Sequence, residues 1–195
     1  MKVIGLTGGV GCGKSTVANM IKENFNASVL IADDIGAELM QPGQICYREI
    51  VAEFGEEILM EDGSLDRKRL AAIVFADDVQ LSVLNGIIHP RVKEYINYEV
   101  KKIKDEARKD YIFIESAIIL KCGYEDICDE FWYISAPYEE RVRRLKESRN
   151  YSDAKIEAIM SNQNQEEEFE KRCSIILENN GDIKKIFSQL KILLV

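Results

Sequence analysis

The sequence predicts an α/β protein built on a five-stranded parallel sheet, and three observations lead to this fold class. Short apolar runs rich in Val, Ile and Phe recur along the chain, as buried strands do. Segments with helical periodicity separate these runs, which is typical of strand-helix-strand units. A glycine-rich motif directly follows the first run and precedes the first helical segment.

The glycine-rich motif spans Gly8 to Thr16 and fits the pattern G-x-x-x-x-G-K-[ST]. Glycines let several backbone N–H groups converge on one phosphate, and the following helix directs its positive end to the same point. The motif predicts an ATP-phosphate site made by Gly11, Cys12, Gly13, Lys14, Ser15 and Thr16. In this site Lys14 reaches the β- and γ-phosphates, the Ser15 hydroxyl is a ligand of Mg²⁺, and Thr16 donates to the α-phosphate.

Composition excludes several functional classes. The 195 residues carry a net charge of -8, which argues against nucleic-acid binding because duplex affinity needs basic patches. No apolar run approaches the ~20 residues that cross a bilayer, so we expect a cytoplasmic protein without membrane contact.

The five cysteines show no C-x-x-C pair and are expected to be free thiols. Cys12 lies among phosphate-binding amides that favour a thiolate, which suggests oxidation-sensitive activity.

Two further predicted strands end in carboxylates. Residues 28–32 read as a fully buried second strand followed by Asp33 and Asp34, and residues 111–115 as a third strand ending at Glu115. Ligands of parallel sheets bind at the carboxyl ends of strands. Asp33 is therefore the candidate to bind and deprotonate an acceptor hydroxyl, with Asp34 capping the next helix. Glu115 either holds a magnesium-bound water, or orients Asp33 and the acceptor, or is a strand-end charge paired with a nearby lysine.

Residues 36–109 predict a helical insert between strands two and three, because helical patterns occur there without a convincing buried strand. Pro90 is expected to break or kink the last helix of this insert, predicted from residue 77 to 108. Inserts of this length usually bind substrate or cover a site. His89, the single histidine, either contacts the substrate or is a satisfied turn residue.

The remaining chain completes the sheet and adds a charged segment. Residues 131–135 and 174–178 predict the fourth and fifth strands, and a closing helix follows the turn at 179–181. The segment 139–171 suits a mobile lid whose arginines, Arg144 and Arg149 among them, neutralise charge on the transferred phosphate. A solvated helix pair is the alternative interpretation of this segment. The core then comprises about 1–35, 110–138 and 172–195 of a single domain.

With these residues in place, the whole chain resembles the dephospho-CoA kinase family. The helical insert carries the most specific part of this resemblance, in the blocks 54–59, 62–67, 75–77 and His89-Pro90. Other matches lie at 4–9, 32–33, 136–137, Arg144, Gln163 and 179–181. The resemblance implies a P-loop NTPase fold of the nucleoside-monophosphate-kinase type with a helical substrate-binding insert and a lid.

The activity implied by the resemblance is the ATP-dependent phosphorylation of the ribose 3′-hydroxyl of dephospho-CoA, the last step of coenzyme A synthesis. ATP and dephospho-CoA are then the partners, Mg²⁺ the cofactor, and the chain a monomer or weak homo-oligomer. The family's usual Asp-Ala-Asp reads Ile31-Ala32-Asp33 here, so only the second acid is present. Lid matches differ as well, with Ser148 and Arg149 where the family commonly has Arg-Asp.

Two other functions fit parts of the pattern. A nucleoside, nucleotide or shikimate-type kinase shares the core but not the insert. A GTP-dependent switch would use Asp33-Asp34-Ile35-Gly36 as a D-x-x-G motif, but the chain has no N-K-x-D sequence to read guanine.

Overall fold

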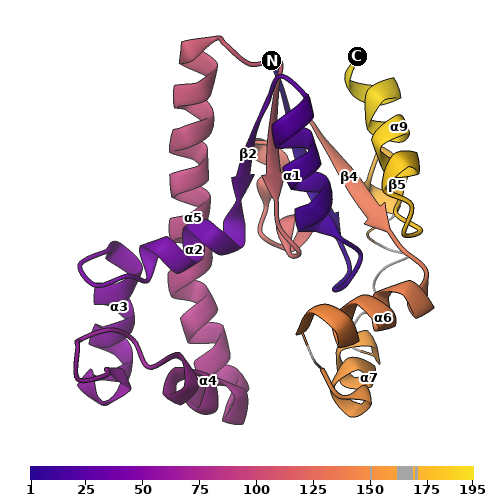
Figure 1. Ribbon diagram of the computed structural model, residues 1–195. Helices are drawn as coiled ribbons and strands as arrows, with labels where there is room; N and C mark the ends of the chain where they lie inside the picture. Colours follow the sequence, from indigo (N-terminus) through magenta and orange to yellow (C-terminus); the bar gives the residue numbers. More distant parts are fainter. Residues whose placement is uncertain (150, 162–168, 170) are drawn as a thin grey trace. The chain divides into compact units, whose positions relative to one another are not determined.

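A computed structural model describes residues 1–149, 151–161, 169 and 171–195 (Figure 1). The strands are β1 (Lys2–Gly8), β2 (Ala27–Ile31), β3 (Tyr111–Glu115), β4 (Glu130–Ser135) and β5 (Ile175–Glu178). The helices are α1 (Lys14–Asn24), α2 (Ala32–Leu39), α3 (Ile45–Phe54), α4 (Arg67–Ala76), α5 (Asp78–Glu106), α6 (Tyr138–Arg149), α7 (Asp153–Ser161) and α9 (Ile183–Leu194). Three short 3-10 turns are η1 (Glu56–Ile58), η2 (Ile119–Lys121) and η3 (Tyr124–Asp126).

The five strands form one all-parallel sheet in the order β2-β3-β1-β4-β5, which confirms the predicted fold class. The central strand β1 pairs with β3 in a register that places Leu6 opposite Glu115, and with β4 in a register that places Gly8 opposite Ile134. The carboxyl end of β1 therefore lies between the ends of two neighbouring strands. Ligand sites of parallel sheets form at this edge.

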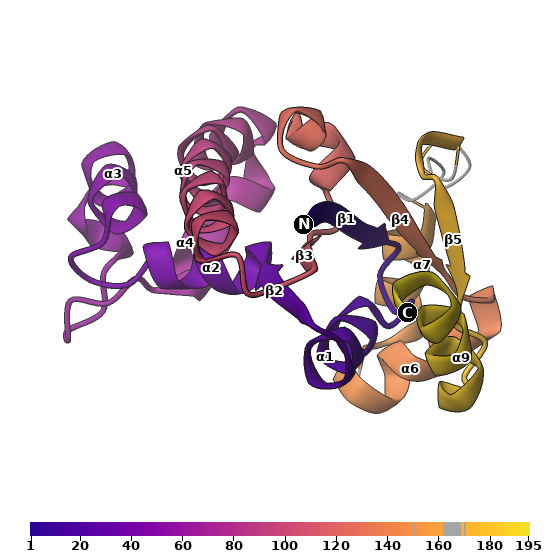
Figure 2. The same cartoon turned by 90° about the horizontal axis from the view of Figure 1, so that it is seen from above.

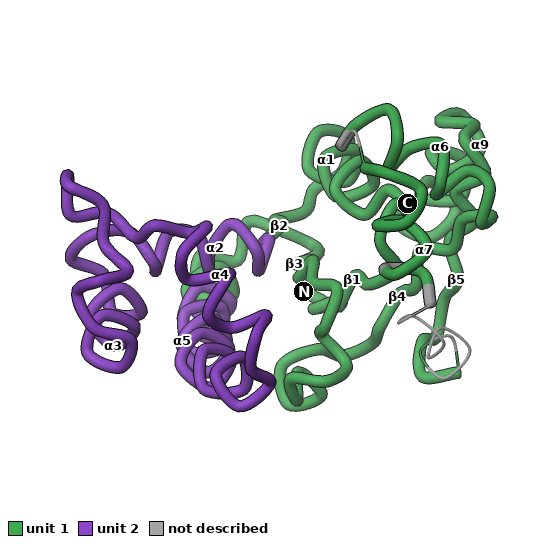
Figure 3. Tube along the Cα trace, turned by 90° about the horizontal axis from the view of Figure 1, so that it is seen from below, with its two compact units in different colours: residues 1–30, 102–195 green, residues 31–101 purple. Residues whose placement is uncertain are grey.

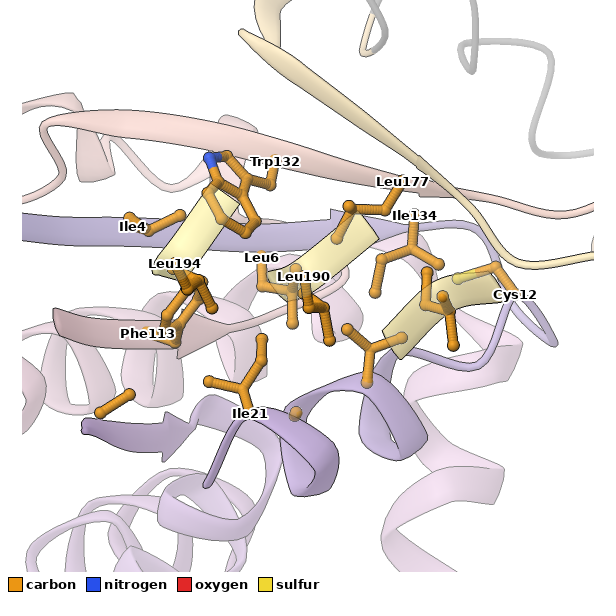
Figure 4. Packing of buried hydrophobic residues seen from close by; sticks show 14 residues of the cluster. Ile4, Leu6, Cys12, Ile21, Phe113, Trp132, Ile134, Leu177, Leu190 and Leu194 are labelled. Carbon is orange, nitrogen blue, oxygen red and sulfur yellow. The ribbon is translucent and has the colours of Figure 1, made fainter. Parts of the chain in front are cut away.

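The main core lies between the sheet and the helices α1 and α9, which cover one of its faces (Figure 2). Alternate residues of the strands point into it, including Phe113 and Trp132, whose rings meet edge to face with centroids 5.3 Å apart. The indole of Trp132 keeps a hydrogen bond to Glu130 at 2.8 Å, so its N–H is satisfied. Figure 4 shows Cys12 at one end of this cluster, close to Ile134. The loop after β1 is thus anchored in the core.

The second strand differs from its prediction. Residues 28–32 were expected to be fully buried, but in β2 only Ala27 is buried and the other residues are partly exposed. The strand order explains this, because β2 is at the edge of the sheet and has a neighbour on one side only. Ala32, assigned to the strand by the sequence, begins α2 instead.

The chain divides into two compact units, coloured separately in Figure 3. The first unit comprises residues 1–30 and 102–195 and contains the glycine-rich loop, α1 and α9. The second comprises residues 31–101 and consists of helices, apart from an isolated antiparallel bridge between Leu59 and Leu65. None of the helices in the described part of the chain is long and apolar enough to cross a membrane.

The expected break of the helix at Pro90 is wrong, and the alternative, a kink at Pro90, stays a prediction. Helix α5 runs without interruption from Asp78 to Glu106 and contains Pro90 in its interior. Proline removes one N–H and costs about 3 kcal/mol in a helix. Buried contacts of Val92, Ile96 and Val100 in the following turns offset this cost.

Candidate active site

The glycine-rich loop connects the end of β1 to the start of α1, as the motif requires. Helix α1 begins at Lys14, and its N-cap residue Gly13 has the left-handed conformation φ 93°, ψ 28°. No side chain caps this helix end. Its first N–H groups, together with the helix dipole, are therefore available to an anion.

The loop packs closely against Asn179 and Arg144 on one side, which is called its outer side below. This packing explains why glycine stands at position 13. A Cβ there would lie 2.4 Å from Nδ2 of Asn179 and 3.2 Å from Nη1 of Arg144. A side chain would collide with these groups, and its φ angle is one that L-residues avoid. Asn179 follows β5 directly and Arg144 lies in α6, so the loop is in contact with two other elements of the first unit.

Lys14 extends over its own loop. Its ammonium nitrogen Nζ donates to the backbone carbonyl of Gly8 at 2.9 Å and to that of Gly9 at 3.3 Å. Ser15 and Thr16 occupy the first turn of α1 and are exposed. A cation and two hydroxyl groups thus lie at the helix end that attracts anions.

Cys12 is buried within the loop, with 1% of its surface exposed. Burial raises the pKa of its thiol, although the nearby Lys14 acts in the opposite direction. The expected thiolate at this position is therefore wrong, because loss of water outweighs the neighbouring positive charge. The backbone of Cys12 takes part in the loop while its side chain belongs to the core.

Glu115 ends β3 and is 4% exposed, which is rare for a carboxylate. The next residue, Ser116, donates its backbone N–H to the carbonyl of Leu6 at 3.1 Å, so the end of β3 stays attached to β1. Glu115 also acts electrostatically on Cys12, raising the pKa of that thiol. A buried acid thus lies on the strand next to the glycine-rich loop.

Helix α6 supplies two arginines to the outer side of the loop. Nε of Arg141 donates to the carbonyl of Val10 at 2.9 Å, and Arg141 is 5% exposed. Nη1 of Arg144 donates to the carbonyl of Cys12 at 2.9 Å. Arg149 is the last residue of α6, and its side chain lies outside the described part of the structure. Gln163, one of the family matches, also lies outside it.

The two candidates for the acceptor side belong to the second unit. Asp33 lies exposed in the first turn of α2. The predicted cap at Asp34 is wrong, because the N-cap residue is Ile31 and no side chain caps α2. His89 lies in α5 and is partly buried, which lowers the pKa of its imidazole.

Asn179 contacts the glycine-rich loop, although sequence analysis placed it in a turn and among the family matches without giving it a role in the site. It is 6% exposed, and its Nδ2 donates to the carbonyl of Cys12 at 2.8 Å. Its place just after the fifth strand is the signal that was available, because strand ends at this edge of the sheet face ligands.

Comparison with known proteins places the chain in a family. A family model described as dephospho-CoA kinase matches residues 2–185. The dephospho-CoA kinase of Aquifex aeolicus is 37% identical over 193 residues, which cover 98% of this chain and 95% of the relative. That of Moorella thermoacetica is 35% identical over 184 residues, which cover 94% and 86%.

Solved structures with the same fold were also found. The crystal structure of TT1252 from Thermus thermophilus is 31% identical, with a TM-score of 0.79 over 99% of this chain and 96% of the other. Dephospho-CoA kinase from Campylobacter jejuni, at 22% identity, and shikimate kinase from Acinetobacter baumannii, at 16%, share the fold with TM-scores of 0.63 and 0.56. The match with the Campylobacter jejuni enzyme covers 98% of this chain and 95% of that one. The match with shikimate kinase covers 99% of this chain and 91% of that one. The chain belongs to the dephospho-CoA kinase family, whose members catalyse the final step of coenzyme A biosynthesis.

Proposed function

We propose that this chain transfers the γ-phosphoryl group of ATP to the ribose 3′-hydroxyl of dephospho-CoA. The observation that carries the proposal is the uncapped N-terminus of α1 behind the glycine-rich loop, in a chain that matches the family from residue 2 to 185. In-line transfer of a phosphoryl group needs positioning and neutralisation of charge more than covalent chemistry. A loop of convergent amides beside a lysine supplies both.

The ATP side of the site is assigned to the loop and the first turn of α1. Backbone N–H groups of Gly11, Cys12 and Gly13 surround the phosphates in this proposal. Lys14, already bonded to the Gly8 carbonyl at 2.9 Å, neutralises the β- and γ-phosphates. Thr16 donates to the α-phosphate.

Mg²⁺ is the cofactor of the proposal, and the donor set fits it. Within the described residues the Ser15 hydroxyl is exposed and engaged by no side chain or backbone group, so it can serve as a ligand. The described residues contain no group of three His, Cys, Asp or Glu side chains for a metal cage. Mg²⁺ typically takes few protein ligands together with phosphate oxygens and water, and in this proposal Glu115 holds such a water. When bound, the ion draws negative charge from the phosphates during transfer.

The acceptor side is assigned to the second unit together with Glu115. Asp33 accepts the proton of the 3′-hydroxyl, since it lies two residues beyond the end of β2 and is exposed. His89 and Glu115 are proposed to contact the acceptor substrate. The helical unit of residues 31–101 is then the part that recognises dephospho-CoA.

Neutralisation of the negative charge on the transferred phosphoryl group is assigned to arginines of α6. The sequence leaves Arg141, Arg144 and Arg149 as candidates, of which Arg144 and Arg149 are assigned here. The segment 139–171 is proposed to act as a lid. Arg144 contacts the loop directly, through the carbonyl of Cys12. It therefore contributes to the ATP site from the outer side of the loop, while Arg149 is left to contact the transferred phosphate.

The test is a coupled assay of ADP release with ATP and one acceptor at a time: dephospho-CoA, shikimate, adenosine or AMP. We expect turnover with dephospho-CoA only, and a product with one additional phosphate at the 3′ position by phosphorus NMR. Turnover restricted to another acceptor would refute the proposal. The proposal also includes a cytoplasmic location. It includes a monomer or weak homo-oligomer as well, and gel filtration over a range of concentrations checks this oligomeric state.

A further inference from the structure

Three consecutive carbonyls on the outer side of the glycine-rich loop are held by side chains. The carbonyl of Val10 accepts from Arg141 at 2.9 Å, and that of Gly11 from Arg144 at 3.3 Å. The carbonyl of Cys12 accepts twice, from Arg144 at 2.9 Å and from Asn179 at 2.8 Å. In a planar trans peptide the carbonyl and the following N–H point in opposite directions. Donors that hold the Cys12 carbonyl therefore also fix the direction of the Gly13 N–H.

Asn179 is held in this contact by hydrogen bonds of both its backbone and its side chain. Its backbone N–H donates to the carbonyl of Ser135 at 2.8 Å, which ties it to the end of β4. Its Nδ2 donates to Cys12, and its Oδ1 accepts from Nη2 of Arg144 at 3.2 Å. At 6% exposure a side-chain amide needs such partners. The orientation of this amide is therefore set by its surroundings.

The guanidinium of Arg144 has five N–H donors, and each has a protein acceptor. Nε donates to Glu140 at 2.8 Å, Nη1 to the carbonyls of Gly11 and Cys12, and Nη2 to the backbone and side-chain oxygens of Asn179. All three nitrogens of the guanidinium therefore donate to acceptors of the protein itself. Arg144 is thus arranged to support the loop.

We propose that Asn179, together with Arg144, is a positioning residue for the ATP phosphates. It holds the peptide between Cys12 and Gly13 so that the Gly13 N–H faces the phosphate site, and it makes no contact with the reacting atoms. The inference rests on the proposed binding of ATP by the glycine-rich loop. It goes further by assigning to the loop after β5 a role in phosphate affinity.

The test replaces Asn179 by Asp, which keeps the shape and the contact with Arg144. The new carboxylate oxygen faces the Cys12 carbonyl and repels it. We expect KM for ATP to rise about tenfold, with KM for dephospho-CoA and the melting temperature little changed. Asn24→Asp is the matched control, because Asn24 also donates to a backbone carbonyl, that of Met20 at 2.9 Å, but is exposed at the end of α1. An unchanged KM for ATP, or an equal rise of both KM values with a lowered melting temperature, would overturn the inference.

A second measurement separates phosphate positioning from recognition of the base. Binding of ATP and of inorganic triphosphate is measured by calorimetry with wild type and Asn179→Ala, which also serves if the Asp variant does not fold. Positioning of the loop predicts the same fold-loss for both ligands, about tenfold. A loss for ATP with unchanged triphosphate binding overturns the inference. Failure of the proposed function is distinguishable, because wild type and Asn24→Asp would then show no transfer to dephospho-CoA at all.

Discussion

The ammonium of Lys14 lies 2.9 Å from the carbonyl oxygen of Gly8, the residue that ends β1. This contact bridges the two ends of the glycine-rich loop, because Lys14 is the first residue of α1. The lysine side chain therefore lies across the glycine-rich loop. In the proposed function this lysine binds the phosphate as well as the loop, so its removal is expected to affect both.

Replacement of Lys14 by Ala is expected to reduce kcat/KM at least ~10³-fold, since the charge on the γ-phosphate loses its partner in the transition state. The measurement is steady-state ADP release with dephospho-CoA as acceptor. Lys22→Ala is the control, because Lys22 lies in the last turn of the same helix, and it should keep the wild-type rate. A near-normal rate for the Lys14 variant would exclude the phosphate role of the loop.

Asp33→Asn is expected to lower kcat about 10²-fold or more while KM for ATP stays within about twofold, because the acceptor hydroxyl loses its general base. Asp34→Asn is a matched control in the same first turn of α2, and it should remain within about threefold of wild type if only the first acid reaches the hydroxyl. The two variants are compared at saturating ATP and dephospho-CoA. Equal losses in both variants would contradict the assignment to Asp33.

Glu140 makes the stability of the first unit depend on acid pH. Hydrogen bonds from Arg143, and the charge of Arg144, lower the pKa of this carboxyl to about 2 from its ordinary value of 4.5. A depressed pKa means that the stabilisation is complete above the ordinary value and is lost as pH falls toward 2. The melting temperature of wild type should therefore exceed that of Glu140→Gln at pH 6, and the difference should shrink between pH 4.5 and 3. Glu139→Gln, exposed one residue earlier, should show no such trend.

The sequence predicted the parts of the fold that depend on local pattern. The apolar run at 111–115 matches β3 residue for residue, and the expected insert at 36–109 contains the helices α3, α4 and α5. Burial of β2 was mispredicted because it depends on strand order, which places that strand at the sheet edge. Continuity of α5 across Pro90 was also missed, since packing in the turns after it outweighs a local rule.

The candidate site was likewise derived from local pattern, and its residue roles stay predictions. The motif itself identified the loop, and strand ends identified Asp33 and Glu115 as candidates. Contacts between residues far apart in the sequence could not be predicted from the spacing of motif residues. Asn179 and Cys12 are separated by 167 positions and meet only because β5 and β1 flank β4 in the sheet. The elevated pKa of the Cys12 thiol likewise depends on burial that the motif does not encode.

Two glycines of the second unit predict opposite effects of the same substitution. A Cβ at Gly86, in the middle of α5, would meet no atom within 4 Å, so Gly86→Ala should stabilise this unit by about 0.5–1 kcal/mol through helix propensity. A Cβ at Gly43 also has open space, but its φ of +85° disfavours any L-residue, so Gly43→Ala should destabilise by about 1 kcal/mol. Urea unfolding followed by circular dichroism measures both. The same sign for both variants would show that space, and not backbone conformation, decides the outcome.

Burial of Cys12 predicts slow modification of its thiol. In the native protein Cys122 and Cys173, which are partly exposed, should react with iodoacetamide first, while Cys12 should react only after unfolding. The elevated pKa of the Cys12 thiol adds to this protection, because the thiolate is the reactive form. Peptide mass mapping after timed labelling at pH 8 gives the rate at each position, and labelling in urea is the control in which all five cysteines should react alike. If Cys12 in the native protein reacted as fast as Cys173, the loop would have to open readily, and the anchoring of Cys12 in the core would not hold in solution.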